Sequence, residues 1–209
     1  MSAAEIRDQL IAQRVVPVLR LASIELIERA VDGLAQAGFG AVEITVTIPG
    51  AVALIGKLSA RLLVGAGTVL DLETAHRCLD AGARFIVSPC AVRGIAGEAH
   101  IADCAALIGG YTPAEVLAAH REGADIVKLF PAASGGPEHL RAIHAVFPDI
   151  LLCPTGGVSL QNMAAYFAAG AALVGVGSAI IDLRALAAGD LARVGAHARR
   201  FLQPDIAAA

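Results

Sequence analysis

The chain alternates short β-branched runs with longer segments rich in alanine and leucine, and this alternation constrains its fold more than any other feature. Three of the longer segments end in the same way, with a Gly-Ala pair that leads directly into the next β-branched run. These pairs are Gly82-Ala83, Gly123-Ala124 and Gly170-Ala171. Glycine ends a helix readily because it adopts the left-handed conformation without strain. Each repeat therefore predicts a helix that is followed by a strand.

Repetition of this step along 209 residues predicts a single-domain (β/α)8 TIM barrel over residues 1–209. The expected strands are 15–21, 41–47, 62–66, 85–88, 105–108, 126–130, 151–154 and 173–176. A first amphipathic helix is expected before them, and later helices at 24–37, 52–60, 72–81, 95–101, 113–122, 137–146, 160–168 and 191–201. A doubly wound open sheet is the alternative architecture.

Composition and charge exclude several classes of protein. The formal charge of −3 and the lack of a basic cluster argue against a nucleic-acid partner. No apolar stretch is long enough to predict a membrane span, and the first residues lack the apolar segment of a secretory signal. The four cysteines have neither metal-site nor disulfide spacing. We therefore expect a cytoplasmic protein with reduced, structural cysteines.

One lysine has an unusual place. The chain contains 16 basic residues, of which only Lys57 and Lys128 are lysines, and Lys128 lies inside the apolar run 124–131. Arginine keeps its proton, whereas a desolvated lysine amine can become neutral and nucleophilic. The alternative is a lysine whose stem packs in the core while its ammonium group reaches water.

A carboxylate is predicted to enter the same interior. Alternation in the run 41–47 places Glu43, Thr45 and Thr47 on one face of the strand, and the opposite, apolar face must meet the helices. A buried carboxylate needs a partner or a task. If Lys128 also points inward, Glu43 can exchange protons with a carbonyl that the amine attacks. The alternative is a glutamate that the neighbouring threonines satisfy by hydrogen bonding.

Further candidate residues lie at strand ends. Val16, Val18 and Arg20 lie on one face of the first strand, with Arg20 at its carboxyl-terminal end. There Arg20 can bind a carboxylate or phosphate of a ligand, or it can form an ion pair with a loop carboxylate. Glycine pairs follow the seventh and eighth predicted strands, at 156–157 and 175–177. Loops at these two places commonly bind phosphate in barrels. The hydroxyl of Thr68, after the third strand, can meet a substrate carboxylate.

Six motifs occur in order along the chain. They are Glu43-Ile44-Thr45, Gly65-Ala66-Gly67-Thr68, Val87-Ser88-Pro89, Lys128-Leu129-Phe130-Pro131-Ala132, Pro154-Thr155-Gly156-Gly157 and Gly175-Val176-Gly177-Ser178. With them, the chain from about residue 15 to residue 178 resembles the 2-keto-3-deoxy-6-phosphogluconate (KDPG) / 4-hydroxy-2-oxoglutarate (KHG) aldolase family. The resemblance implies a class I aldolase on a (β/α)8 barrel, with no metal or other cofactor, usually a homotrimer.

The resemblance also implies roles for single residues. Lys128 looks like the Schiff-base lysine and Glu43 like the general acid/base. The other implied positions are Arg20, Thr47, Thr68, Pro89 and Phe130 for the substrate, and Gly156, Gly157, Gly177 and Ser178 for its phosphate. Some members have arginine where this chain has Thr47, and others combine a threonine there with an arginine that corresponds to Arg20. We therefore expect Arg20 to take over part of the anion binding, at the carboxylate or at the phosphate.

The implied reaction is reversible cleavage of the phosphorylated keto acid KDPG to pyruvate and glyceraldehyde 3-phosphate. KHG, which would give pyruvate and glyoxylate, is a second expected substrate. The galactonate epimer of KDPG is an alternative, although Pro154-Thr155 before the glycine pair favours the gluconate form. Two other classes stay open: a phosphate-binding barrel isomerase or synthase in which Lys128 only pairs with Glu43, and a catalytically silent barrel that binds a sugar phosphate.

Overall fold

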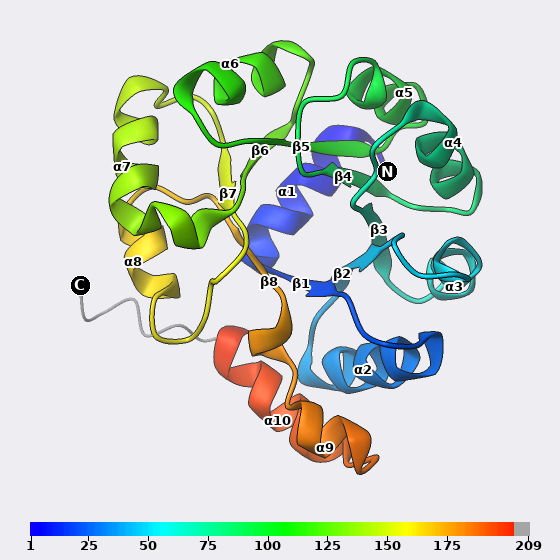
Figure 1. Ribbon diagram of the computed structural model, residues 1–209. Helices are drawn as coiled ribbons and strands as arrows, with labels where there is room; N and C mark the ends of the chain where they lie inside the picture. Colours follow the sequence, from blue (N-terminus) through cyan, green and yellow to red (C-terminus); the bar gives the residue numbers. More distant parts are fainter. Residues whose placement is uncertain (203–209) are drawn as a thin grey trace.

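Eight parallel strands form the centre of the molecule, and helices surround them (Figure 1). The computed structural model describes residues 1–202, so residues 203–209 of the predicted domain lie outside the described part. The strands are β1 Val15–Leu19, β2 Ala41–Thr45, β3 Leu63–Gly67, β4 Phe85–Ser88, β5 Ala105–Gly110, β6 Ile126–Leu129, β7 Leu152–Pro154 and β8 Val174–Val176. All eight predicted strands are present, with ends that shift by two residues at most.

The ring of strands closes between β7 and β8. Strands β1 to β7 lie in chain order, and β8 pairs with β1. Thr155 and Gly175 form a parallel bridge, and the N–H of Ala172 donates to the carbonyl of Leu152 at 2.9 Å. An open doubly wound sheet would instead reverse its strand order and leave two edges unpaired. The predicted (β/α)8 barrel is therefore confirmed, and the doubly wound sheet is excluded.

Helices follow the strands around the ring. They are α1 Ala3–Gln13, α2 Ile24–Ala37, α3 Ala51–Leu58, α4 Leu72–Asp80, α5 Ile95–Ile101, α6 Pro113–Arg121, α7 Gly136–Val146, α8 Met163–Ala168, α9 Leu183–Ala187 and α10 Leu191–Leu202. Two short 3₁₀ turns, η1 Ala132–Ser134 and η2 Ser178–Ile180, follow β6 and β8. Side-chain caps explain several helix starts: Ser23, Asp71 and Thr112 each accept the N–H three residues ahead.

The helices depart most from the prediction at two places, and elsewhere their ends shift by two residues at most. Helix α8 begins at Met163 rather than at residue 160, because the carboxamide oxygen of Asn162 accepts the N–H of Ser159 at 2.8 Å and holds a turn there. Helix α9 was not predicted from the sequence. Asp182 starts it by accepting the N–H groups of Arg184 and Ala185, so the acidic residue before Leu183 was the available signal.

Alternation along the strands produces two apolar cores. Val42 and Ile44 face the helices in the larger core, whereas Ile126 and Phe85 belong to a smaller core inside the barrel. Helix α1 lies across the amino-terminal end of the barrel (Figure 1), and its Ile6 and Leu10 are fully buried in the inner core. Apolar side chains thus fill the amino-terminal half of the barrel interior, and polar side chains lie at its carboxyl-terminal end.

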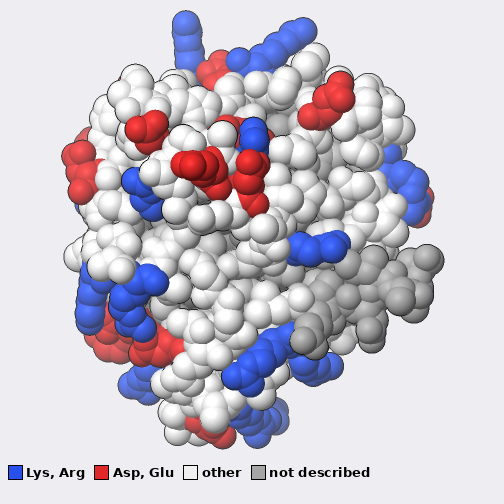
Figure 2. Space-filling view, turned by 180° about the vertical axis from the view of Figure 1, so that it is seen from behind, with Lys and Arg blue, Asp and Glu red and all other residues white. Residues whose placement is uncertain are grey.

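The surface carries charges of both signs. On the face that Figure 2 shows, acidic and basic side chains lie in small mixed groups, and large uncharged areas separate one group from the next. Some charges pair between neighbouring helices, as in the 2.5 Å contact of Lys57 on α3 with Glu28 on α2. Among residues 1–202, no helix combines the length and the apolar character that crossing a bilayer requires.

Candidate active site

A cavity of about 610 Å³ opens at the carboxyl-terminal ends of the strands. In (β/α)8 barrels this end carries the active site, because the loops after the strands meet there. The cavity brings together ten residues that the sequence predicted: Arg20, Glu43, Thr68, Pro89, Lys128, Phe130, Gly156, Gly157, Gly177 and Ser178. Thr47 is absent from this lining. Strand β2 ends at Thr45, and the turn that follows leaves Thr47 exposed, with its hydroxyl 3.4 Å from that of Thr45.

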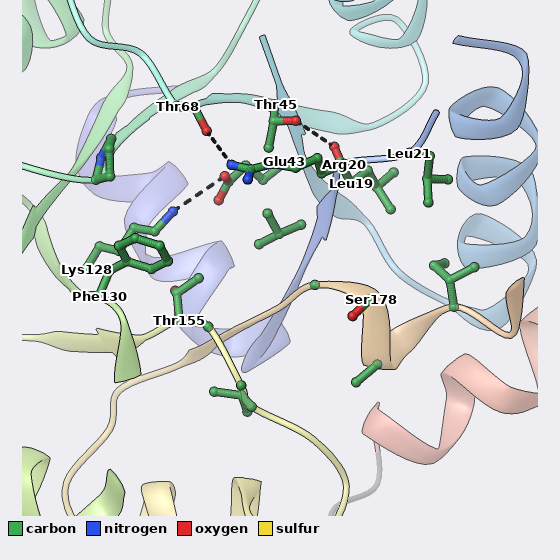
Figure 3. A pocket seen from close by; sticks show the side chains of 18 of the residues that line it. Leu19, Arg20, Leu21, Glu43, Thr45, Thr68, Lys128, Phe130, Thr155 and Ser178 are labelled. Carbon is green, nitrogen blue, oxygen red and sulfur yellow. Dashed lines mark hydrogen bonds and ion pairs between the residues drawn. The ribbon is translucent and has the colours of Figure 1, made fainter. Parts of the chain in front are cut away.

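Lys128 and Glu43 meet inside the barrel (Figure 3). The Nζ atom of Lys128 lies 3.6 Å from Oε1 of Glu43, and the two residues are only 5% and 3% exposed. Oε1 makes no hydrogen bond to any residue that the structure describes. The ammonium head of Lys128 therefore does not reach water at the surface, and the alternative of a lysine with a solvated head is wrong.

The threonines beside Glu43 do not satisfy its carboxylate. The hydroxyl of Thr45 donates to the carbonyl of Leu19 at 3.2 Å, on the neighbouring strand. Gly67 instead makes room for Glu43, since a Cβ added at Gly67 would lie 2.0 Å from Oε1. The alternative in which Glu43 is a structural residue held by threonines is therefore wrong. Glu43 keeps an oxygen free to act on whatever Lys128 binds.

Arg20 bridges two strands at the mouth of the cavity. Its Nη2 donates to the hydroxyl of Thr68 at 3.3 Å, and it forms no ion pair among the described residues. Thr68 itself has a φ of 64°, an unusual conformation for a residue with a Cβ, at the point where the chain leaves β3. Arg20 and Thr68 thus form a cationic and hydroxyl pair beside Glu43, suited to a carboxylate.

Phe130 and Pro89 line the same cavity as the lysine. The Phe130 ring is 38% exposed, and its centroid lies 5.6 Å from Nζ of Lys128. Gly109 allows the chain around Pro89 to come close, because a Cβ there would lie 2.1 Å from the Pro89 carbonyl carbon. An apolar wall beside the amine shields an imine from water.

The far end of the cavity is lined by backbone and small side chains. Gly156 and Gly157 have φ of 90° and 82°, a region that only glycine enters easily. Opposite them, Ser178 starts the turn η2 after β8. Neither Gly157 nor Val158 donates its backbone N–H to another described residue. This end can therefore offer N–H groups and a hydroxyl to an anion.

Sequence reasoning missed two residues near the lysine. Thr155 lines the cavity, and Cys153 lies in register with Lys128 on the neighbouring strand. Burial raises the pKa of the Cys153 thiol to about 11, although the contact with Thr155 and the charge of Lys128 oppose this change. Both residues share the inward face of β7, so the period-two pattern applied to Lys128 would have found them.

No group of three or more His, Cys, Asp or Glu side chains within residues 1–202 is arranged to hold a metal ion. The four cysteines are free thiols, and only Cys90 is exposed. The lysine and glutamate are therefore the reactive groups that the cavity itself presents.

The closed barrel, the buried lysine and the carboxylate beside it define a class of enzyme, the class I or Schiff-base aldolases. Residues 6–197 match the family model described as KDPG and KHG aldolase, and the chain belongs to that family. It is 37% identical to a 2-dehydro-3-deoxy-phosphogluconate aldolase of Pseudomonas aeruginosa, over 91% of this chain and 88% of the relative.

Two further relatives bear on substrate and chemistry. A probable 2-dehydro-3-deoxy-6-phosphogalactonate aldolase of Rhizobium meliloti is 36% identical, over 84% of this chain and 85% of the relative. The crystal structure of KDPG aldolase from Legionella pneumophila, with pyruvate captured as a covalent carbinolamine intermediate, has a TM-score of 0.82 and 29% identity. That alignment covers 93% of this chain and 96% of the other.

Proposed function

We propose that this protein cleaves KDPG reversibly to pyruvate and glyceraldehyde 3-phosphate through a Schiff base on Lys128. The observation that carries the proposal is the buried approach of Lys128 Nζ to Glu43 Oε1 at 3.6 Å. The carbinolamine in the Legionella pneumophila relative is the adduct that an amine forms with a ketone, and it supports the same chemistry here.

Imine formation assigns one task to each of the two residues. The neutral amine of Lys128 attacks C2 of the keto acid, and Glu43 gives a proton to the carbonyl oxygen as the carbinolamine forms. Loss of water from this carbinolamine leaves a protonated imine. Glu43 acts within reach of atoms bound to Nζ, and its free Oε1 is the position for these transfers.

The protonated imine then accepts the electrons of the C3–C4 bond. Glu43 removes the proton of the C4 hydroxyl, the C3–C4 bond breaks, and glyceraldehyde 3-phosphate leaves. The electron pair of the broken bond forms an enamine on C3. Glu43 returns this proton to C3, and addition of water to the resulting imine releases pyruvate and restores the amine of Lys128. The imine nitrogen supplies the electron sink, so this sequence needs no metal ion.

We propose that the carboxylate and the phosphate of the substrate bind at opposite ends of the cavity. Arg20 and Thr68 are proposed to bind the carboxylate, since their hydrogen bond holds the guanidinium beside Glu43. Gly156, Gly157, Gly177 and Ser178 are proposed to bind the phosphate, and Pro89 and Phe130 to enclose the pyruvoyl group. KHG needs only the first half of this arrangement, so we propose it as a second substrate.

Relatives of both substrate preferences resemble this chain, with 37% identity to the gluconate type and 36% to the galactonate type. We propose the gluconate epimer, and the test is pyruvate release from each epimer, coupled to NADH oxidation, with Lys128→Ala as the control. Faster release from the galactonate epimer would reverse the assignment. Ligand binding without pyruvate release from either epimer, or an isomerase activity that survives Lys128→Ala, would support the classes without a Schiff base.

We also propose a homotrimer in the cytoplasm. Both assignments rest on the membership of the family and the likeness to its relatives. Light scattering coupled to size exclusion measures the first, and a mass of about one or two chains rather than three would contradict it. Fractionation of the cells that produce the protein tests the second.

A further inference from the structure

Helix α8 contributes two side chains that hydrogen-bond to the backbone near the far end of the cavity. Asn162 precedes the helix, Tyr166 lies within it, and neither lines the cavity. Asn162 and Tyr166 are one helical turn apart, and both make hydrogen bonds to backbone carbonyls outside their helix. The sequence assigned neither residue a role. Their partners lie in the loop after β7 and in the turn after β6.

Asn162 closes the loop that carries Gly157. Its amide Nδ2 donates to the carbonyl of Gly157 at 2.9 Å, and its Oδ1 accepts the N–H of Ser159 at 2.8 Å. Both polar ends of one carboxamide are therefore bound to a stretch of three residues. The carbonyl of Gly157 shares a peptide plane with the N–H of Val158, so the bond from Asn162 also fixes the direction of that N–H. The N–H of Gly157 shares a plane with the carbonyl of Gly156, which accepts the N–H of Ala133.

Tyr166 holds the turn that lies behind this loop. Its hydroxyl donates to the carbonyl of Ala132 at 3.1 Å, and the residue is only 1% exposed. Burial raises the pKa of this hydroxyl, so it remains a proton donor at neutral pH. The carbonyl that it meets belongs to η1, the turn that directly follows Phe130 and Pro131.

Turn η1 and the glycine loop are packed into one unit. The N–H of Ala132 donates to the carbonyl of Thr155 at 2.8 Å, and that of Ala133 to the carbonyl of Gly156 at 2.9 Å. A Cβ added at Gly157 would lie 2.5 Å from the Cβ of Ala133. A shift of η1 would therefore move the glycine loop with it.

We infer that Asn162 and Tyr166 are positioning residues for the phosphate, which hold the Gly156–Gly157 loop in the conformation that presents its N–H groups. This inference rests on the proposed phosphorylated substrate. Lys128 and Glu43 pair with each other, Arg20 donates to Thr68, and none of the three bonds to Asn162 or Tyr166. The two side chains should therefore affect the phosphate end of the substrate and leave imine formation unchanged.

Steady-state kinetics with two substrates test the inference, because KDPG carries a phosphate and KHG does not. For Asn162→Ala and Tyr166→Phe we expect a rise in KM for KDPG of about three- to tenfold, since the first loses two hydrogen bonds and the second loses one. KM for KHG, and kcat for both substrates, should stay within about twofold of the starting values. Tyr111→Phe is the matched control, because it removes the chain's other tyrosine hydroxyl and should change neither KM.

A merely structural role gives a different result. Equal losses with both substrates, in step with a lower Tm, would overturn the inference, and so would unchanged KM values in both variants. Stabilisation of the protein by inorganic phosphate, measured as a shift in Tm, provides a readout without catalysis. If the unaltered protein releases no pyruvate from either substrate, the proposed function fails, and a weaker phosphate response in Asn162→Ala still supports the positioning role. An unaltered response overturns it.

Discussion

Lys128 on β6 and Glu43 on β2 approach each other to 3.6 Å across the interior of the barrel. Alternate strands of a (β/α)8 barrel contribute side chains to the same interior layer, so the second and sixth strands direct these groups to one depth. Burial of two opposite charges costs several kcal/mol for each ion, and replacement by apolar residues is often neutral for stability. The pair is therefore best explained by its chemistry.

Reduction of an imine should mark Lys128. Incubation with pyruvate and borohydride is expected to add a pyruvate-derived mass to this residue and to abolish activity, because the reduced adduct cannot be hydrolysed. Peptide mass spectrometry locates the adduct. Lys128→Arg is the control that keeps a positive charge beside Glu43 but offers no amine that can form an imine. A label on another residue, or no label, would contradict the proposed mechanism.

Removal of the proton carrier should slow the reaction without preventing binding. For Glu43→Gln we expect kcat to fall about 10²- to 10⁴-fold, the range for loss of a general acid/base, while KM stays nearly constant. Stopped-flow or coupled kinetics measure both constants. If Glu43 served only to neutralise Lys128, kcat would fall far less than this, and the proposed proton transfers would have to be assigned elsewhere.

A methyl group at Gly67 should displace Glu43. The new Cβ would lie 2.0 Å from Oε1, so the carboxylate must rotate away from Lys128. We expect Gly67→Ala to lower kcat at least tenfold with a circular dichroism spectrum like that of the unaltered protein. Gly97→Ala is the matched control, because no atom lies within 4 Å of the added Cβ and the position is helical. Equal activity of the two variants would exclude the steric role of Gly67.

Two substitutions test the anchoring of the carboxylate. Arg20→Ala removes the cation that is bound to Thr68, and we expect KM for KDPG and for KHG to rise tenfold or more. Thr47→Ala should leave both KM values within about twofold, since Thr47 lies outside the lining of the cavity. A rise in KM for KDPG alone in Arg20→Ala would place Arg20 at the phosphate. A rise in Thr47→Ala would support the substrate contact that the sequence predicted.

Burial should protect three of the four thiols. Desolvation raises the pKa of Cys78 and Cys153 from 9.0 to about 11, and it also raises that of Cys104. At pH 8 we expect iodoacetamide to label Cys90 alone in the folded protein and all four residues in denaturant, as mass spectrometry can count. Rapid labelling of Cys153 would show that the barrel opens around Lys128.

The same thiols predict a pH dependence of stability. Their pKa is higher in the folded state, so the folded protein binds more protons at alkaline pH than the unfolded chain does. The stabilisation is complete below about pH 9, and it is lost as the pH rises toward 11. Denaturant unfolding at pH 8 and pH 10 measures the loss, and Cys78→Ala should reduce it. Equal stability of the unaltered protein at both values would contradict the prediction.

The sequence predicted the eight strands because their local pattern is strong. Apolar runs of strand length that are bounded by helical segments need no tertiary information. The family motifs and the end of the first strand, at Arg20, then marked ten residues that line the cavity. The ends of elements were less predictable. Strand β2 stops at Thr45 and leaves Thr47 outside, while the side chain of Asn162 delays α8 to Met163. The α8 boundary depends on one side-chain hydrogen bond, from the N–H of Ser159 to Asn162, which residue types alone do not reveal.

The sequence by itself thus determined the alternation of strands and helices, the inward faces of Glu43 and Lys128, and the family to which they point, because period and motif are local properties of the chain. Only the tertiary structure decided that Lys128 Nζ and Glu43 Oε1 lie 3.6 Å apart and that Gly67 makes room for the carboxylate. It also decided that Asn162 and Tyr166 hydrogen-bond to the carbonyls of Gly157 and Ala132. These relations arise when distant strands close into a ring, and closure fixes distances that no local pattern contains.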